Sequence, residues 1–208
     1  MEKLKENFIK IGIWGLVCFF TVLYISLLFN HNIWTDEAFT LQLLRGNVKE
    51  IIAGTAADVH PPLYYLYAKL FDVICGSSLI VQKIAAIIPM VATLVFIATV
   101  IRKHFGDMTS FLSLLFLSCI PCSMEFALQV RMYSLALFFV TVCAMYAYLA
   151  FLNGNKKEFL IFALSGVAAA YTHYFAFVSI IIITGMLLLA ILIWRRERVV
   201  LWLISAVS

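Results

Sequence analysis

The sequence predicts an all-α polytopic membrane protein, a bundle of transmembrane helices with interfacial helices in its first outer loop. Of its 208 residues, 64% are hydrophobic and only 12% are charged, and the mean hydropathy is +1.04. Soluble domains are about 45–50% apolar and about 25% charged, so a water-soluble fold could not cover this much apolar surface. The net charge of +4 comes from separate clusters and not from a basic stripe, which argues against a nucleic-acid partner.

Long uncharged runs predict six complete spans and the start of a seventh. A helix needs about 20 apolar residues to cross a bilayer. The run at residues 159–194 contains no Asp, Glu, Lys or Arg and is too long for one crossing at ~1.5 Å per residue. We therefore divide it at residues 171–174, where polar atoms concentrate. The other predicted spans are residues 11–29, 84–101, 109–124 and 132–152, and the seventh begins at Val199.

The positions of lysine and arginine predict the orientation, because cytoplasmic loops are enriched in both. Clusters of lysine and arginine precede the first span and follow the second, fourth and sixth spans. All of them lie on the cytoplasmic side only if residues 61–76 do not cross. We therefore expect a cytoplasmic N-terminus and an outer-side helix or re-entrant segment at residues 61–76, resting on the protein. The clusters are Lys3, Lys5 and Lys10; Arg102 and Lys103; Lys156 and Lys157; and Arg195, Arg196 and Arg198.

The first outer loop carries two signals for short helices. Thr35 is expected to cap a helix whose first turn holds Asp36 and Glu37, since acidic side chains suit the positive end of a helix dipole. Asn47, with a glutamate three residues later, predicts a capping box for a second helix that ends near Gly54. Two short amphipathic helices lying in the membrane interface fit this pattern.

Ionisable residues from segments far apart in the sequence are predicted to meet at the outer face. Asp36 and Glu37 follow the first span, His60 precedes two prolines, Arg131 lies between two spans and His173 interrupts an apolar run. Each has a structural alternative: helix capping, a solvated loop, an interfacial arginine or a hydrogen-bonded core histidine. Together, carboxylates that accept protons and cations that hold phosphate suit a lipid-phosphate substrate at a membrane surface.

Three motifs resemble those of GT-C glycosyltransferases, in the branch of protein mannosyltransferases and aminoarabinose transferases. They are WTDEA at residues 34–38, DVHPPLYY at 58–65 and QVRMYSL at 129–135. The acidic pair alone is a weak motif, whereas the His-Pro-Pro-Leu-Tyr-Tyr string at this distance is specific. Family members continue through more spans and a sizeable outer loop. The resemblance therefore implies that residues 1–208 form one transmembrane module, the N-terminal part of a longer enzyme, with residues 30–83 as its first outer loop.

The resemblance implies a transferase that moves a hexose or pentose from a polyprenyl-phosphate donor to an outer-face acceptor, with inversion at the sugar carbon. The acceptor is a lipid, a glycan or a protein. Asp36 matches the residue assigned as general base, which removes the proton of the acceptor hydroxyl. Arg131 is the first choice for stabilising the leaving phosphate, ahead of Lys69 and Lys83. The other residues of the implied substrate site are Glu37, His60, Tyr64, Tyr133 and His173.

The resemblance leaves two points of this site open. Some relatives carry lysine at the position of His173, so no phosphate role is carried over to this histidine. A divalent metal is also left open, because several GT-C enzymes use one and others do not. The residues that would hold the metal are Asp36, Glu37 and His60.

A transporter or lipid-binding membrane protein without chemistry is the alternative prediction. Transporters place charges near the bilayer midplane and contain internal repeats. Here the charges gather at one face and we find no repeat, which favours an enzyme. A scaffold would instead predict that alanine at Asp36, His60 and Arg131 has no effect. We expect an integral protein of a bacterial plasma membrane, with membrane lipids as further partners.

Overall fold

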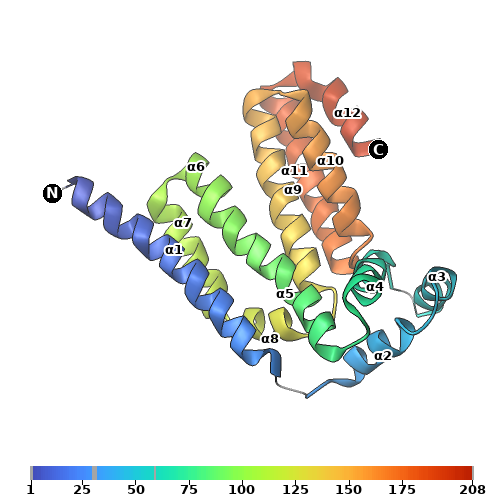
Figure 1. Ribbon diagram of the computed structural model, residues 1–208. Coiled ribbons are helices and arrows are strands. Elements are labelled where there is room, and N and C mark those ends of the chain that lie inside the picture. The colour runs from blue at the N-terminus through green and yellow to red at the C-terminus, as the bar shows by residue number, and fades with distance from the viewer. Residues whose placement is uncertain (1, 30–31, 59, 208) are drawn as a thin grey trace.

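The computed structural model describes residues 2–29, 32–58 and 60–207, and every regular element in these ranges is a helix. Two groups of helices lie side by side, joined by packing between α5 and α9 (Figure 1). The first group contains α1 (Glu2–Ser26), α5 (Leu79–Phe96) and α7 (Asp107–Cys119). The second contains α9 (Tyr133–Asn153), α10 (Lys156–Ala170) and α11 (Tyr174–Trp194). This arrangement confirms the predicted all-α membrane bundle.

Within the described ranges, four helices are long and apolar enough to cross a membrane. They are Asn7–Phe29, Leu79–Phe105, Tyr133–Asn153 and Tyr174–Trp194. The predicted fifth crossing corresponds to α10, whose 15 residues span only about 22 Å, less than the ~30 Å hydrocarbon core. This helix nevertheless packs along both α9 and α11. The number of six crossings therefore stays a prediction.

The predicted third span is not one straight helix. α7 is followed by α8 (Pro121–Leu128), and the two are bent by 71° at Ile120. Pro121 is the cause, because its ring pushes the preceding residue out of the helical region. Ile120 accordingly has φ −71° and ψ 120°. The bend turns α8 toward the outer loops and places residues 125–129 beside the start of α2.

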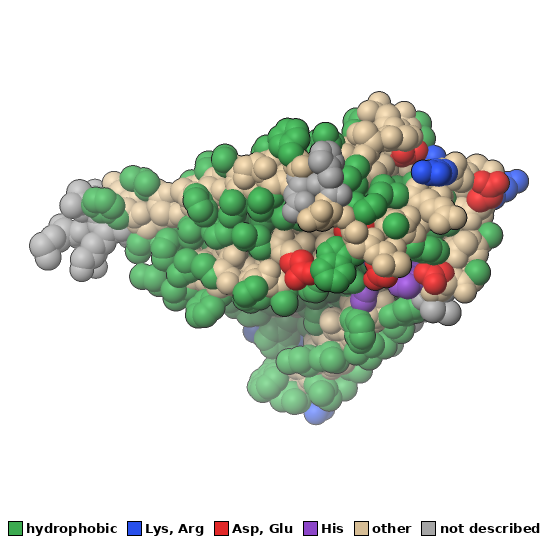
Figure 2. All heavy atoms as spheres, turned by 90° about the horizontal axis from the view of Figure 1, so that it is seen from below, with side chains coloured by type: hydrophobic (Ala, Val, Ile, Leu, Met, Phe, Trp, Pro, Cys, Tyr) green, Lys and Arg blue, Asp and Glu red, His purple; other side chains and the backbone are tan. Residues whose placement is uncertain are grey.

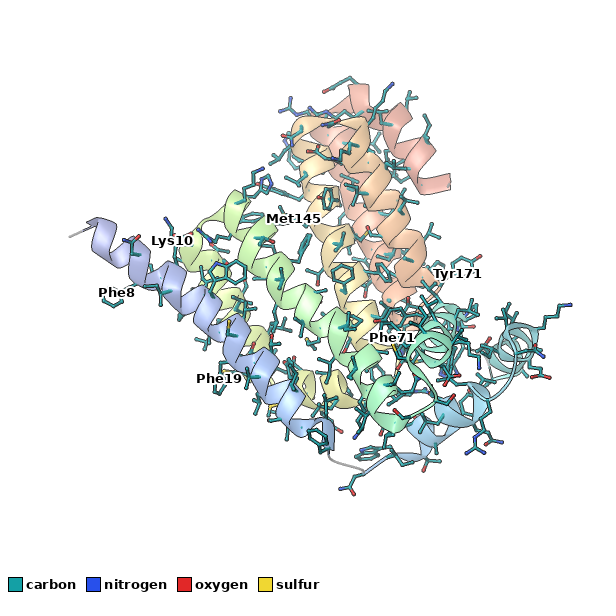
Figure 3. All side chains as sticks on the ribbon, in the orientation of Figure 1. Phe8, Lys10, Phe19, Phe71, Met145 and Tyr171 are labelled. Atoms are coloured by element: carbon teal, nitrogen blue, oxygen red, sulfur yellow. The ribbon has the colours of Figure 1, made fainter. Side chains whose placement is uncertain are left out.

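The basic clusters lie at one end of the bundle (Figure 1). α5 continues through a π-helical turn (η2, Ile97–Ile101) into α6 (Arg102–Phe105), and Gly106, with φ 87°, allows the sharp turn into α7. Asp107 then pairs with Arg102 at 2.7 Å and with Lys10 at 3.9 Å. Figure 3 shows the side chain of Lys10 on α1. The turn between α9 and α10 and helices η3 (Arg196–Arg198) and α12 (Val199–Val207) lie at the same end. This is the arrangement on which the predicted orientation depends.

Helices α2 (Thr35–Leu43) and α3 (Val48–Ala57) lie in the segment predicted to be the first outer loop. The N-cap of α2 is Trp34 and not the predicted Thr35, because the Glu37 carboxylate accepts the Trp34 backbone N–H at 2.9 Å and draws Thr35 into the helix. The capping box at Asn47 is confirmed. However, α3 runs to Ala57 and not only to Gly54. A Cβ on Gly54 would stand 2.5 Å from Leu43 Cδ1, so this glycine serves close packing of α2 on α3.

Helix α4 (Leu63–Cys75) is the segment predicted to stay on the outer side. Its 13 residues span about 20 Å, too little for a crossing. One face is buried, and the opposite face exposes Leu70, Val73 and Ile74. The backbone N–H of Leu63 donates to the Tyr171 carbonyl at 3.0 Å, which ties the start of α4 to the α10–α11 turn. α4 is thus held against the outer end of the bundle.

Candidate functional site

The Glu37 carboxylate joins the first outer loop to the start of α9. Its Oε2 accepts the Trp34 N–H at 2.9 Å, and its Oε1 accepts the Val130 N–H at 2.8 Å. Glu37 is only 2% exposed. Hydrogen bonds to a charged acceptor are stronger than neutral ones, the more so away from water. The sequence placed Glu37 in a substrate pocket, whereas in the structure both of its oxygens hold backbone groups of the protein.

Arg131 is the second buried charge of the site and is 5% exposed. Its Nη1 donates to the Asp36 carbonyl at 3.3 Å, to Thr40 Oγ1 at 3.4 Å and to the Tyr65 hydroxyl at 3.2 Å. Its Nη2 lies 3.4 Å from His60 Nε2 and 3.9 Å from Asp36 Oδ2. The guanidinium therefore fastens α2, α4 and the segment before α4 to the start of α9.

The contacts of His60 fix its tautomer. Arginine can only donate hydrogen bonds, so His60 Nε2 must accept from Arg131. The ring proton then sits on Nδ1, which lies 2.8 Å from the Asp58 carbonyl and 2.9 Å from Asp58 Oδ2. His60 thus bridges a carboxylate and a guanidinium.

Asp36 differs from its neighbour Glu37 because its side chain is 67% exposed. It lines an open pocket of about 380 Å³ at the junction of α2 and α8. The wall also contains the carboxylate of Glu125 and the aromatic rings of Trp34 and Phe126. Figure 2 shows this end of the molecule, where acidic and histidine side chains gather among hydrophobic ones. Asp36 can therefore meet a ligand from solution while it stays close to Arg131.

The aromatic members of the predicted site lie at different depths. Tyr133 lines the same pocket as Asp36, and its ring centre is 5.8 Å from that of His173. Tyr64 is 1% exposed, and burial, the largest cause, raises the pKa of its hydroxyl well above the ordinary value. Its neighbour Tyr65, not singled out from the sequence, is the tyrosine that contacts Arg131. The structure thus brings Asp36, His60, Arg131, Tyr133 and His173 together and places Tyr64 in the core beneath them.

His173 caps α11 and lies at the edge of the cluster. Its Nδ1 accepts the Phe175 N–H at 3.0 Å, which requires an unprotonated nitrogen. Burial lowers the pKa of the imidazole, and repulsion from His60 and Arg131 lowers it further. The ring is therefore neutral at pH 7, and its proton is on Nε2.

The two lysines considered for phosphate binding are both largely buried. Lys69 Nζ donates to the Leu44 carbonyl at 2.6 Å and to Asp72 at 2.9 Å. Lys69 therefore belongs to the junction of α2 and α4. Lys83 is buried near the start of α5.

The residues considered for a metal do not fit one. Both oxygens of Glu37 accept backbone N–H groups, and His60 Nε2 accepts from Arg131. Among the described residues, no three His, Cys, Asp or Glu side chains are arranged to hold a metal ion. We therefore derive no step through a metal.

Comparison with known proteins identifies the family. An apolar helix bundle with this charged cluster at one end has the features of a membrane enzyme that acts at the bilayer surface. The family model for dolichyl-phosphate-mannose-protein mannosyltransferase matches residues 59–207. The chain belongs to this family, whose members are membrane glycosyltransferases of the GT-C type. No curated protein and no solved structure matches the chain.

The family match bears differently on the members of the site. His60, Arg131 and His173 lie within the matched residues, whereas Asp36 and Glu37 precede them. Asp36 and Glu37 are included in the site because Glu37 contacts Val130 and Asp36 contacts Arg131. Membership favours the predicted glycosyltransferase over the transporter alternative.

We predict that Glu37→Gln destabilises the protein by about 1.5–3 kcal/mol, because one buried backbone N–H then loses its charged acceptor. Urea or thermal unfolding in detergent would measure the loss. Glu50→Gln is the matched control, since Glu50 accepts the Asn47 N–H at 2.8 Å in an exposed capping box. Its expected loss is below about 1 kcal/mol. Equal losses in the two variants would contradict the role of Glu37.

We also predict that His173 makes the protein less stable in acid. Because its pKa is lowered on folding, the unfolded chain binds more protons as the pH falls below about 6.5, and stability decreases. Asparagine can accept the same N–H but does not titrate. Between pH 7 and pH 5, the melting temperature should therefore fall by about 2–4 °C less in His173→Asn than in the wild type. Identical decreases would show that His173 does not titrate in this range.

Proposed function

We propose that the protein transfers a sugar from a polyprenyl-phosphate donor to an acceptor hydroxyl at the outer face, with inversion and with Asp36 as general base. One observation carries this proposal. In a membrane chain of this family, Asp36 is an exposed carboxylate that lines an open pocket and lies 3.9 Å from a buried guanidinium. The acceptor is a lipid, a glycan or a protein.

The proposed step is a single displacement. The acceptor hydroxyl loses its proton to the Asp36 carboxylate while its oxygen attacks the anomeric carbon of the sugar. The bond from that carbon to the phosphate oxygen breaks, and the polyprenyl phosphate leaves with the electron pair. Attack opposite the leaving group inverts the configuration at this carbon. The base must lie within hydrogen-bond reach of the hydroxyl, and the exposure of Asp36 supports this.

Arg131 is proposed to stabilise the charge that develops on the phosphate. At 5% exposure it lies beneath the pocket, so we propose that it acts mainly through its field. Fixed charges in a site shielded from water stabilise a transition state without reorganisation.

The remaining residues are proposed to shape and position the site. Tyr133 and His173 would form the wall on the α9–α11 side, and His60 would hold the guanidinium. Glu37 and Tyr64 are proposed to support the site from the protein interior, because both are buried. We expect the N-terminus of the chain to lie in the cytoplasm of a bacterial cell.

We predict that Asp36→Asn lowers the turnover number about 10²–10⁴-fold, the usual contribution of a general base. The assay would follow transfer from polyprenyl-phosphate mannose in membranes that contain the full-length protein. Glu197→Gln is the matched control, since this carboxylate is 66% exposed at the opposite end of the molecule. If Asp36→Asn is expressed normally and keeps wild-type turnover, the base assignment is wrong.

We predict opposite labelling of the two ends of the bundle. In a cysteine-free background, Lys49→Cys on α3 should react with a membrane-impermeant maleimide added to intact cells. Lys103→Cys and Lys157→Cys should react only after the membrane is permeabilised. The reverse pattern would place the Asp36 pocket in the cytoplasm and overturn the proposed orientation.

A further inference from the structure

A second pocket lies at the opposite end of α2 from Asp36. It is formed where the ends of α2 and α4 meet the start of α5, and its volume is about 220 Å³. Pockets that bury drug-sized ligands hold about 300–1,000 Å³, so this one suits a smaller unit. Its polar lining residues are Arg45, Asp72, Ser77, Ser78 and Gln82, none of which belongs to the site described above.

Gln82 is one of the lining residues, and its side chain has an unused hydrogen-bond acceptor. The residue is 1% exposed, and its Nε2 donates to the Ala68 carbonyl at 3.3 Å. Its Oε1 is buried and has no hydrogen-bond partner among the described residues. An amide oxygen buried without a donor is unfavourable, and such groups are rare in folded proteins. A rotation of this side chain toward the pocket would let a ligand hydroxyl supply the missing donor.

The carboxylate of this pocket is already paired within the protein. Lys69 Nζ lies 2.9 Å from Asp72 Oδ2, so the carboxylate does not need a cationic ligand. Burial alone would raise the pKa of Asp72, but hydrogen bonds from Lys69 and Ser77 outweigh this effect and lower it. Arg45 lies on the same wall as this carboxylate. An anionic ligand drawn by Arg45 would therefore also meet the negative charge of Asp72.

A neutral ligand with several hydroxyl groups satisfies this lining best. Each hydroxyl both donates and accepts hydrogen bonds, and the wall offers both kinds of partner. Arg45 and the serine hydroxyls donate, whereas Asp72 and Gln82 accept. Leucine side chains, among them Leu44, complete the wall and can contact the apolar face of a sugar ring.

We propose that this pocket is a carbohydrate subsite that binds one neutral sugar ring of an acceptor glycan. The role of the glycan as acceptor rests on the function proposed above. Asp36 lies in the first turn of α2 and Arg45 lies just past its end, so the nine residues of α2 at ~1.5 Å each separate the two pockets by about 14 Å. A glycan of a few rings can reach from one pocket to the other. The subsite thus selects glycans from the three acceptor classes.

Binding of α-mannotriose to the full chain in nanodiscs tests the proposal, and the absence of sugar-based detergent avoids competition. The dissociation constant should rise at least tenfold in Gln82→Leu, which removes the unused acceptor at similar size. Gln42→Leu is the matched control, because Gln42 is exposed on α2 and does not line the pocket. It should bind as the wild type does. Ser77→Ala, an exposed and milder change, should weaken binding severalfold and replaces Gln82→Leu if that variant does not fold.

Three results would overturn the subsite. The first is wild-type affinity for mannotriose in both the Gln82→Leu and Ser77→Ala variants. The second is no binding to the wild type at millimolar sugar. The third is displacement of the trisaccharide by millimolar inorganic phosphate in the wild type but not in Arg45→Gln, which would make the pocket an anion site. This experiment measures sugar binding and does not depend on catalysis. Full turnover in Asp36→Asn would contradict the assignment of Asp36 as general base, but it would not change the expected effect of Gln82→Leu on binding.

Discussion

The hydrogen bonds of the Glu37 carboxylate are the contact on which the outer end of this protein depends. One oxygen holds the backbone N–H of Trp34 three residues before it, and the other holds that of Val130, 93 residues later. The first bond starts α2 and the second fixes α2 to the entry of α9. Asp36 directly precedes Glu37, and Arg131 directly follows Val130, so each is next to a partner of the second bond. Their separation of 3.9 Å is therefore set by the backbone as well as by their own attraction.

The clamp also explains how a buried guanidinium is tolerated. Removing an arginine from water is unfavourable unless acceptors surround it. Both Nη atoms of Arg131 find them in α2, in α4 and in His60, because Glu37 holds α2 close enough. The Nε of Arg131 has no hydrogen-bond partner among the described residues. Glu37, Arg131 and His60 thus form one network that joins α2 and α4 to the start of α9.

Local sequence signals were sufficient for most of the fold. Apolar runs predicted the long helices, and Asn47 with Glu50 predicted the start of α3 correctly. The errors concerned the points at which helices begin, end and bend. Gly54 looked like a helix end, but its small size serves packing against Leu43. Thr35 looked like a cap, but Glu37 transferred that place to Trp34. The bend before Pro121 had a local cause that the long apolar run concealed.

The sequence indicated which residues gather at this end of the bundle, but not how they are arranged. Adjacent residues on a helix point about 100° apart, so in each neighbouring pair only one side chain faces the centre of the site. Tyr65 reaches Arg131 whereas Tyr64 enters the core, and Asp36 faces the pocket whereas Glu37 faces the protein. The rotation of α2 and α4 about their axes decides which residue of each pair faces the centre of the site. Contacts with Val130 and Tyr171, far away in the sequence, set that rotation. A motif can therefore name the residues of this site, but only the packed outer end assigns them their roles.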